Sequence, residues 1–503
     1  MLQEQISEYV DVLIVGAGIS GIGAAYYLQK NSPKKTYAIL ERRERLGGTW
    51  DLFKYPGIRS DSDMFTLGYE FKPWTDEQAI ADGPRIWNYL NETARENGID
   101  KHIRYNKKAI NANWDSKTAR WTVEIADEKT GETTALTCAF LFMGAGYYNY
   151  DEGYTPNFEG RDDFKGTIIH PQFWDENLDY SGKKVVVIGS GATAVTLIPS
   201  MTDKAAHVTM LQRTPSYVMA RPQGDGLNRL FRRFFSDEAA YHMTRWKNVR
   251  LMSFFYNLSR KYPNFMKKVM VNQAKQQLND SHDWETNFVP PYDPWDQRVC
   301  AVPNADLFRA IKKGQASVVT DHIERFDETG IQLKSGKHLD ADIIVTATGL
   351  NLQLMGGIQL SVDGEVQDMS TKYAYKSMMF SDIPNLVNSI GYTNASWTLK
   401  TDLTCEYVTR LLNYLDEKDL DYAVPRQDDP DFETEDLLDF TSGYVQRSIH
   451  LFPKQGTKAP WKTVQNFIYD RKIIRYSPLD DGVMEFGKAS ERAEQDEPAI
   501  AAQ

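Results

Sequence analysis

Residues 9–21 read YVDVLIVGAGISG, an apolar run that ends in a glycine-rich turn. The run resembles a strand buried on both faces, and the stretch IGAAYYLQK that follows has helical spacing. A second short apolar run, YAIL, ends at Glu41, 20 residues after Gly21. This strand–helix–strand order predicts the opening unit of a doubly wound parallel sheet.

The spacing of the glycines in this turn has a physical reason. Gly16 makes the tight turn, Gly18 lets the backbone approach a pyrophosphate, and Gly21 lets the helix pack closely on the strand. The start of the helix offers free N–H groups and the positive end of its dipole to phosphates. Glu41 is placed to accept hydrogen bonds from ribose hydroxyls. The turn therefore predicts a dinucleotide site, which also includes Ser20.

A second unit of the same type begins with KVVVIGSGATAVTLIPSM at Lys184 and continues with HVTMLQR. When its second strand is aligned with the first, Gln212 stands where Glu41 stood, and Arg213 follows. Loss of the acid beside a cation suits a 2′-phosphate, so this site is predicted to prefer NADPH to NADH. The other predicted contacts of this second site are Gly189, Gly191, Ala192, Thr193 and Thr214.

Bulk properties restrict the function classes. The chain has 503 residues and a net charge of −11, which disfavours a general affinity for nucleic acid. The three cysteines are far apart and form no CxxC pair, so we expect a reducing compartment and neither a disulfide scaffold nor a metal centre. The N-terminus lacks the basic start of a secretory signal, and the chain is expected to be cytoplasmic.

Residues 227–278 differ from the rest because aromatic and basic residues recur there at helical spacing. We expect a helical insertion with a basic face. Such a face is either simply solvated or rests weakly on an anionic membrane surface, and the sequence leaves both open. The cluster comprises Arg229, Arg232, Arg233, Arg245, Lys247, Arg250, Arg260, Lys261, Lys267 and Lys268.

A third motif lies between the two glycine turns. Phe164, Gly166, His170 and Trp174 fit the pattern F-x-G-x3-H-x3-W, and the earlier stretch 47–61 fits G-G-x-W-x4-Y-P-G-x3-D. With two flanking dinucleotide motifs, the chain resembles the type I Baeyer–Villiger flavin monooxygenases, most closely the ethionamide-activating ones. The second motif contributes Gly48, Thr49, Trp50, Tyr55 and Asp61 to the predicted cofactor contacts; Trp50 and Tyr55 could also be ordinary core residues.

The resemblance implies a fold class and a domain order. It implies an α/β protein with two Rossmann-like domains, for FAD and NADPH, and a helical insertion. The expected divisions are an FAD-binding domain of residues 1–150 and 384–503, an NADPH-binding domain of 151–221 and 290–383, and an insertion of 222–289. From the residues alone, the strand end at Ala347, Thr348 and Gly349 could form a linker or lie close to a cofactor.

The resemblance also implies a reaction. NADPH would reduce FAD, O2 would add to give a C4a-peroxyflavin, and attack on a ketone would yield an ester or lactone, with sulfoxidation as a side activity. The oxygenating cation of the family matches Arg298, and its carboxylate partner matches Asp61. Many relatives carry Lys just before this arginine, whereas this chain has Gln297.

His170 and Trp174 are assigned to coupling the two domains. A lone histidine is more often a structural hydrogen-bonding residue than a general base.

Other function classes remain to be separated by experiment. The nearest alternative is a flavin-containing monooxygenase that acts mainly on nitrogen or sulfur. A disulfide reductase requires paired redox cysteines, which these three do not supply. A flavin-binding scaffold without turnover is the third alternative. The sequence specifies neither the ketone or thioether substrate nor the oligomeric state.

Overall fold

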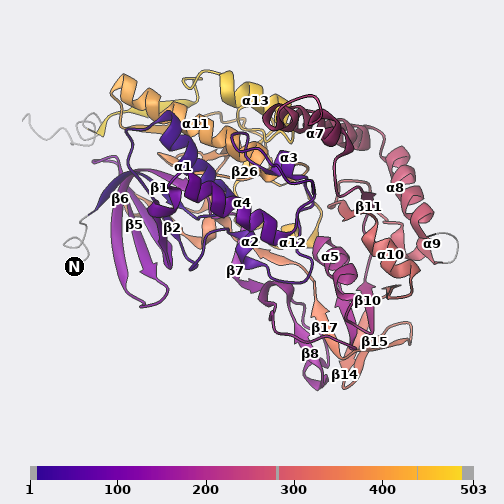
Figure 1. Ribbon diagram of the computed structural model, residues 1–503. Coiled ribbons are helices and arrows are strands. Elements are labelled where there is room, and N and C mark those ends of the chain that lie inside the picture. Colours follow the sequence, from indigo (N-terminus) through magenta and orange to yellow (C-terminus); the bar gives the residue numbers. More distant parts are fainter. Residues whose placement is uncertain (1–7, 279–281, 439, 490–503) are drawn as a thin grey trace, which may run out of the picture.

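The computed structural model describes residues 8–278, 282–438 and 440–489, and Figure 1 shows how they are arranged. Two sheets with parallel cores lie apart from one another: one contains β1, β2, β5 and β6, and the other contains β10 and β17. A separate group of helices, α7 and α8, runs along one side. The predicted α/β class with two Rossmann-like units is confirmed.

The first sheet extends outward from the strand that contains the opening sequence. β1 pairs in parallel with β2 and with β6, while β3 and β23 extend this parallel part. Beyond β6 the order continues through β5, β4, β19 and β20. The strands are β1 (Tyr9–Val15), β2 (Tyr37–Glu41), β3 (Ile103–Tyr105), β4 (Lys107–Asp115), β5 (Arg120–Asp127), β6 (Thr133–Met143), β19 (Gln359–Val362), β20 (Glu365–Val366) and β23 (Leu386–Asn388).

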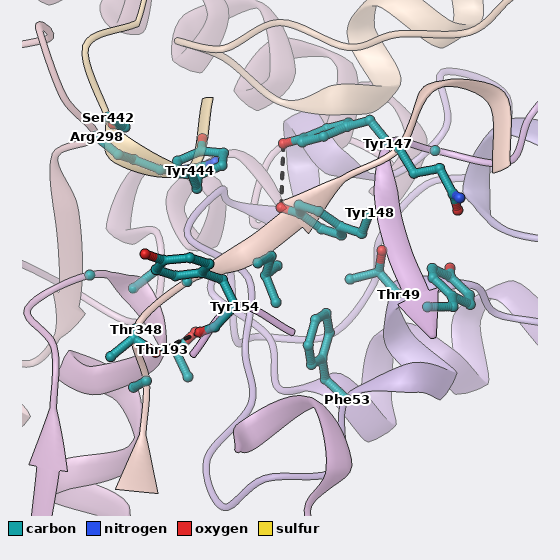
Figure 2. A pocket seen from close by; sticks show the side chains of 18 of the residues that line it. Thr49, Phe53, Tyr147, Tyr148, Tyr154, Thr193, Arg298, Thr348, Ser442 and Tyr444 are labelled. Carbon is teal, nitrogen blue, oxygen red and sulfur yellow. Dashed lines mark hydrogen bonds between the residues drawn. The ribbon is translucent and has the colours of Figure 1, made fainter. Parts of the chain in front are cut away.

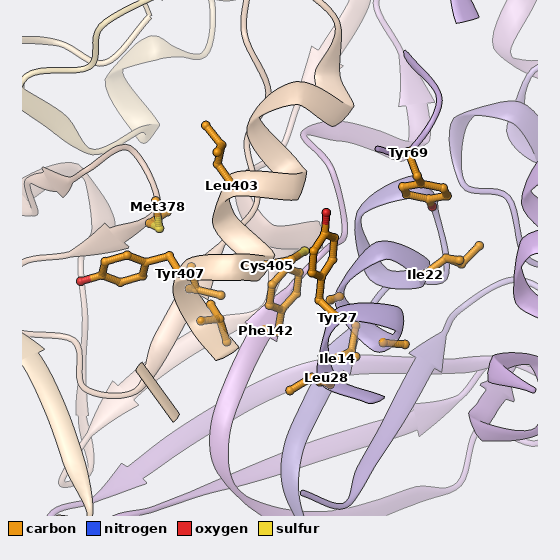
Figure 3. Packing of buried hydrophobic residues seen from close by; sticks show 14 of the residues in the cluster. Ile14, Ile22, Tyr27, Leu28, Tyr69, Phe142, Met378, Leu403, Cys405 and Tyr407 are labelled. Atoms are coloured by element: carbon orange, nitrogen blue, oxygen red, sulfur yellow. The ribbon is translucent and has the colours of Figure 1, made fainter. Parts of the chain in front are cut away.

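Helices α1 (Ile19–Asn31) and α11 (Trp397–Lys418) pack on the parallel part of this sheet. Figure 3 shows Cys405 of α11 lying against Tyr27 of α1 and Phe142 of β6. All three side chains are buried, so two segments almost 400 residues apart share one core. The three cysteines, Cys138, Cys300 and Cys405, are buried and free.

The second sheet is entirely parallel, with the order β13-β10-β9-β17-β8. Its inner strands are buried because helices cover them on the side of α5 and α10. Its outermost strand, β8, comes from the middle of the F-x-G-x3-H-x3-W motif. The elements are β8 (Thr167–Ile169), β9 (Lys184–Ile188), α5 (Ala192–Met201), β10 (His207–Gln212), α10 (Asp306–Lys312), β13 (Ala316–Thr320) and β17 (Ile343–Thr346).

The predicted helical character of residues 227–278 is confirmed. The helices begin after β11 and end before β12, and these two strands pair in parallel and close the base of the insertion. The elements are β11 (Val218–Arg221), α6 (Gly226–Phe231), α7 (Asp237–Lys261), α8 (Pro263–Leu278), α9 (Trp284–Phe288) and β12 (Cys300–Pro303).

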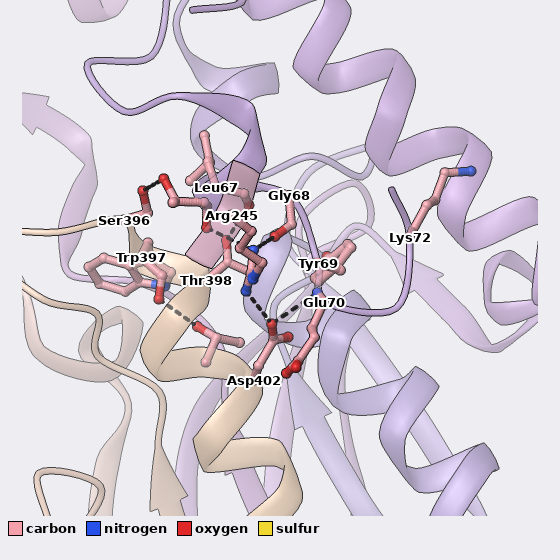
Figure 4. A network of polar contacts seen from close by, with 12 residues as sticks. Leu67, Gly68, Tyr69, Glu70, Lys72, Arg245, Ser396, Trp397, Thr398 and Asp402 are labelled. Atoms are coloured by element: carbon pink, nitrogen blue, oxygen red, sulfur yellow. Dashed lines mark hydrogen bonds and ion pairs between the residues drawn. The ribbon is translucent and has the colours of Figure 1, made fainter. Parts of the chain in front are cut away.

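Helix α7 is fastened to the first domain by a buried ion pair (Figure 4). Arg245 Nη2 lies 3.0 Å from Asp402 Oδ2 of α11, and the Arg245 and Asp402 side chains are only 6% and 2% exposed. Arg245 Nη1 also donates to the carbonyl oxygens of Phe65 and Gly68 at 3.0 and 2.7 Å. The assignment of Arg245 to an exposed basic face was therefore wrong. Its partner lies 157 residues away, so no local pattern could reveal it.

The chain crosses between the two domains on a two-stranded antiparallel ribbon formed by β7 (Tyr148–Gly153) and β18 (Leu350–Leu352). Soon after β18 it re-enters the first sheet, because β19 pairs with β4. We therefore propose that the second part of the first domain begins before residue 359, and not at residue 384.

Smaller elements complete the described chain. Among the residues that the structure describes, no helix combines the length and the apolar character needed to cross a membrane. The remaining helices are α2 (Thr49–Leu52), α3 (Met64–Leu67), α4 (Gly83–Glu96), α12 (Gly443–Gln446) and α13 (Phe467–Tyr476). The remaining strands are β14 (Ile323–Asp327), β15 (Gly330–Leu333), β16 (His338–Asp340), β21 (Ala374–Tyr375), β22 (Met379–Phe380), β24 (Tyr422–Pro425), β25 (Thr434–Asp436), β26 (Lys454–Gly456) and β27 (Met484–Gly487).

Candidate functional site

One continuous cavity of about 990 Å³ joins the two glycine turns. Its wall includes nearly every residue predicted to contact a cofactor, from both domains, although these residues come from distant parts of the sequence. Gly21 and the four residues of the F-x-G-x3-H-x3-W motif do not line it. The predicted residues that do are Gly16, Gly18, Ser20, Glu41, Gly48, Thr49, Trp50, Tyr55, Asp61, Gly189, Gly191, Ala192, Thr193, Arg213, Thr214, Arg298, Ala347, Thr348 and Gly349.

The first glycine turn has the geometry that its spacing requires. Gly16 has φ +102°, which favours glycine. A Cβ on Gly21 would lie 1.9 Å from the Gly16 carbonyl oxygen, so only glycine allows α1 to pack this closely on β1. Gly21 thus acts on packing, and Gly16 and Gly18 face the cavity.

Two backbone segments approach closely at Gly18. A Cβ on Gly48, which has φ +56°, would lie 3.1 Å from the Gly18 Cα. Ser20 is engaged within the protein, because its Oγ accepts from Trp397 Nε1 at 2.9 Å and from Ser389 Oγ at 3.1 Å. Its contribution to the cavity is therefore to hold the Trp397 indole.

Glu41 lies at the end of β2 and is only 4% exposed. Its two carboxylate oxygens accept from the backbone N–H groups of Ala17 and Arg43, both at 2.9 Å. Burial raises the pKa of Glu41, and these two hydrogen bonds limit the rise. Because a carboxylate oxygen can accept more than one hydrogen bond, Glu41 can still accept from a ribose.

The two glycines of the second turn differ in how much space the protein leaves for a side chain. Gly189 has φ +138°, and a Cβ there would lie 2.3 Å from the Ala347 carbonyl oxygen. Gly191 instead has φ −81°, and a Cβ there would meet no protein atom within 4 Å. The space in front of Gly191 lies at the start of α5 and lines the cavity, so it fits a bound pyrophosphate.

This difference gives a test at Gly191. We expect Gly191→Ala to leave the thermal unfolding midpoint of the cofactor-free protein unchanged. The Kd for NADPH should rise at least ~10-fold, because the new methyl group occupies the space of the phosphates. Titration calorimetry and a melting curve measure the two effects separately. Gly226→Ala, also at an open position but outside the cavity, is the matched control; an unchanged NADPH affinity in Gly191→Ala contradicts the assignment.

Arg213 extends from the end of β10 into the cavity wall with its side chain exposed. The neighbouring Gln212 is buried and faces away, since its Nε2 donates to Asn287 O and Thr320 Oγ1, both at 2.8 Å. Lys334 also lines the cavity and is a second cation on its wall, which the sequence analysis did not identify. It lies in the β15–β16 turn, more than 100 residues further along the chain.

Replacing Arg213 by alanine should weaken the binding of NADPH, which carries a 2′-phosphate, much more than the binding of NADH. A charged hydrogen bond contributes ~1.5–3 kcal/mol, so the Kd for NADPH should rise ~10- to 100-fold. The Kd for NADH, which lacks this phosphate, should change less than ~2-fold. Fluorescence titration with both nucleotides measures this, and an equal loss for NADH would remove Arg213 from 2′-phosphate recognition.

Arg298 and Asp61 meet between the two turns. Arg298 lies two residues before β12, Asp61 follows the Tyr55–Gly57 loop, and Arg298 Nε lies 3.3 Å from Asp61 Oδ2. The Arg298 side chain keeps 41% of its surface accessible, and this surface lines the cavity. Its enclosure by protein lowers the pKa of Arg298, but Asp61 and the neighbouring tyrosines Tyr147, Tyr148 and Tyr444 together outweigh this effect, and the pKa lies above its ordinary value. The guanidinium is therefore a fixed positive charge.

Three tyrosines that the sequence analysis did not identify surround this cation (Figure 2). Tyr147 and Tyr148 follow β6, and their hydroxyl oxygens lie 3.3 Å apart. Tyr444 of α12 lies beside Arg298 in the view. Burial raises the pKa of all three, so their hydroxyls stay neutral. Tyr147 also stacks on Trp397, with ring centroids 5.2 Å apart.

The strand end predicted to lie near a cofactor is held in place by the crossing ribbon. Thr348 Oγ1 donates to the Tyr154 carbonyl oxygen at 2.6 Å, and the Arg447 guanidinium lies 3.3 Å from the centre of the Tyr154 ring. Gly349 has φ +115°, which favours glycine. These contacts fix the wall between Thr348 and the ribbon.

The F-x-G-x3-H-x3-W motif lies behind the cavity wall. His170 Nδ1 accepts from Gln172 N at 3.2 Å, so Nε2 carries the proton and donates to Gly349 O at 3.1 Å. Burial lowers the pKa of His170, which keeps the ring neutral. Gly349 itself lines the cavity, so His170 acts on the site through one intervening residue.

The other motif residues pack the second domain. Phe164 joins the core with Val186 and Ile344, and a Cβ on Gly166 would lie 2.3 Å from the Asp342 carbonyl oxygen. Trp174 belongs to a cluster that spans both domains, because this cluster also contains Phe53 and Tyr55 of the first domain. The contacts support the predicted coupling role of the motif, which stays a prediction.

The Tyr55–Gly57 loop gives a second contact between the domains. Gly57 has φ +76°, and a Cβ there would lie 1.8 Å from Ser200 Oγ of α5. Tyr55 lines the cavity and is buried, whereas Trp50 is partly buried against the first core. The two alternatives for these aromatic residues, core and cavity wall, therefore both apply.

Among the described residues, no group of three or more His, Cys, Asp or Glu side chains could hold a metal ion.

Comparison with known proteins identifies relatives of the whole chain. A model of the family described as FMO-like, flavin-binding monooxygenase-like, matches residues 10–379. The chain is 53% identical over 484 residues to the FAD-containing monooxygenase EthA of Mycobacterium tuberculosis, a match that covers 96% of this chain and 99% of EthA.

Solved structures show the same fold at lower identity. A steroid monooxygenase bound to NADP superposes with a TM-score of 0.74 at 21% identity, covering 95% of this chain and 100% of that one. Cyclohexanone monooxygenase from Rhodococcus sp. Phi1, bound to NADP+, superposes with a TM-score of 0.69 at 18% identity, covering 83% of this chain and 86% of that one. The resemblance to flavin monooxygenases drawn from the motifs is thereby confirmed. The chain belongs to the flavin-binding monooxygenase-like family.

Proposed function

We propose that the chain is an FAD- and NADPH-dependent Baeyer–Villiger monooxygenase that inserts one oxygen atom of O2 next to a ketone carbonyl. The observation that carries this proposal is the position of the Arg298–Asp61 pair on one cavity between two dinucleotide turns. The pair places a fixed positive charge between the two nucleotide turns, where the transferred oxygen would carry negative charge. The expected product is an ester or lactone.

The residues on the cavity have separate tasks in this proposal. The turn at Gly16, together with Glu41, holds FAD; the turn at Gly189, together with Arg213, holds NADPH. The bound flavin supplies the oxygen-activating chemistry, and the protein supplies orientation, electrostatics and exclusion of water. Arg298 stabilises the negative charge that develops during oxygen transfer, without needing to move, because Asp61 already orients it.

The neutral tyrosines around Arg298 limit the access of water to the charge. Tyr147, Tyr148 and Tyr444 present ring faces and neutral hydroxyls, so they surround the guanidinium with a weakly polar wall. A charge in such surroundings interacts more strongly with the reacting atoms than it would in bulk water. The same enclosure favours oxygen transfer over loss of the activated oxygen to solvent.

The test is an aerobic NADPH-oxidation screen over ketones and thioethers with identification of the products. We expect NADPH consumption to rise when a ketone is added, with an ester or lactone as the product and some sulfoxide from thioethers. Sulfoxide or N-oxide without ester across the ketone panel would favour the nitrogen- and sulfur-oxidising alternative. NADPH consumption that no substrate stimulates would overturn both.

A further inference from the structure

The helices α6, α7 and α8 carry an unusual amount of exposed apolar surface. Of the 18 large hydrophobic residues that are exposed in the described chain, 11 lie between Leu227 and Val269. Six of them are aromatic, and Phe234 is 75% exposed. Soluble proteins rarely leave so many large apolar side chains together on one surface without a partner. These aromatic residues are Phe234, Phe235, Phe254, Phe255, Tyr262 and Phe265.

On α7 the exposed residues form one face. Met243, Arg250, Phe254 and Lys261 follow one another at intervals of seven, four and seven residues, which places them on one side of a helix. The side turned to the protein contains Arg245, which is held in the buried pair of Figure 4. The orientation of the outer face is therefore fixed by the fold.

The α8 helix continues the same surface. Phe265, Lys268 and Val269 are exposed, while Met266 and Met270 on the opposite side are buried with Tyr217. Helices α6, α7 and α8 contact one another in sequence, so their outer faces adjoin. We call this combined surface the helical face.

The charge of the helical face is opposite to that of the whole protein. Residues 226–278 contain eleven Lys or Arg against two acids, Asp237 and Glu238, although the chain carries −11 overall. Arg232, Arg245, Lys247 and Arg260 are paired with carboxylates. Within the described residues, six cations of this region have no carboxylate within 4.0 Å: Arg229, Arg233, Arg250, Lys261, Lys267 and Lys268.

We propose that the helical face docks on the surface of a lipid bilayer that contains anionic lipid, with the helices lying in the plane of the interface. Exposed aromatic rings enter the boundary between headgroups and acyl chains, and the unpaired cations meet the lipid phosphates. A second copy of the chain fits less well, because an interface between two helical faces would place like charges opposite one another. A nucleic acid would leave the aliphatic residues Met243, Leu251 and Val269 uncovered.

Vesicle flotation with the full-length protein tests the proposal. We expect the protein to float with vesicles of phosphatidylcholine mixed with phosphatidylglycerol, and to float much less with phosphatidylcholine alone or at high salt. The aromatic variant Phe234→Ser/Phe254→Ser/Phe265→Ser and the charge variant Arg250→Glu/Lys261→Glu/Lys268→Glu should each weaken binding at least ~10-fold. Both variants replace exposed side chains, and a melting curve confirms that they fold.

The control variants change exposed residues that lie outside the helical face. Val366→Ser/Leu451→Ser removes exposed apolar side chains, and Lys117→Glu/Lys165→Glu reverses exposed charges; neither should change vesicle binding. Equal flotation with neutral and anionic vesicles, or equal loss in the control variants, would overturn the proposal. A protein that forms dimers in analytical ultracentrifugation, and loses them in the aromatic variant while never floating, would assign the face to a second copy instead.

Discussion

In the Arg298→Ala variant we expect NADPH to reduce FAD at close to the normal rate, while the rate of ester formation falls ~10²-fold or more. Hydride transfer does not require the Arg298 charge, whereas oxygen transfer to a ketone develops negative charge that this guanidinium is placed to stabilise. The cavity holds Arg298 against Asp61 at 3.3 Å and encloses both with neutral tyrosines. Anaerobic stopped-flow reduction and product quantification under air measure the two steps separately.

The conservative variant separates charge from shape at this position. Arg298→Lys keeps a positive charge without the planar fork, so we expect it to recover part of the oxygenation that alanine loses. Asp61→Asn should lower oxygenation less than Arg298→Ala, because the cation remains but is less well oriented. Ester formation at the normal rate in Arg298→Ala would exclude Arg298 from the mechanism and leave the tyrosines as the groups to examine.

Arg245→Met is expected to destabilise the protein by ~3–5 kcal/mol, since it leaves the Asp402 carboxylate buried without its partner. Burial already raises the pKa of Asp402 to about 7, and Arg245 limits this rise. Loss of the pair should release α7 from the first domain. Hydrogen exchange of the α7 amides should then accelerate ~100-fold or more, and the thermal midpoint should fall.

Two further variants show whether the pair itself is responsible. Arg250→Met changes an exposed arginine on the same helix and should alter stability by less than ~0.5 kcal/mol. Arg245→Met/Asp402→Leu removes both charges, so it should be more stable than Arg245→Met alone. If Arg245→Met were as stable as Arg250→Met, the buried pair would not fasten α7.

Local sequence was enough for the glycine turns because their chemistry is local. The turn at Gly16, the strand before it and the acid at Glu41 lie within 33 residues, and the same holds for the second turn and Arg213. The role predicted for Arg298 required the family resemblance, since nothing near it in the sequence indicates a cavity. The structure then brings it to Asp61, 237 residues earlier in the chain.

Neither the three tyrosines around Arg298 nor the buried position of Arg245 could be predicted from the sequence, and the physical reason is the same for both. Tyr147 and Tyr444 reach Arg298 from segments almost 300 residues apart, and an aromatic residue in a loop has no pattern that indicates its direction. Arg245 was grouped with exposed cations because helical spacing predicts which residues share a face of the helix, but it does not predict what that face packs against. The return of the chain that we propose at β19 is not visible in the sequence, because four residues next to the edge strand of a sheet carry little periodicity.

The crossing ribbon of β7 and β18 has a consequence for how the protein is made. The second domain is inserted between β6 and its late partner β23, and α11 covers the same sheet. During synthesis the second domain can therefore fold while the first still lacks three strands, β19, β20 and β23, and a large part of its core. The first domain reaches its final contacts only after α11, which ends at Lys418, has been synthesised, and until then the sheet lacks the apolar cover that this helix supplies.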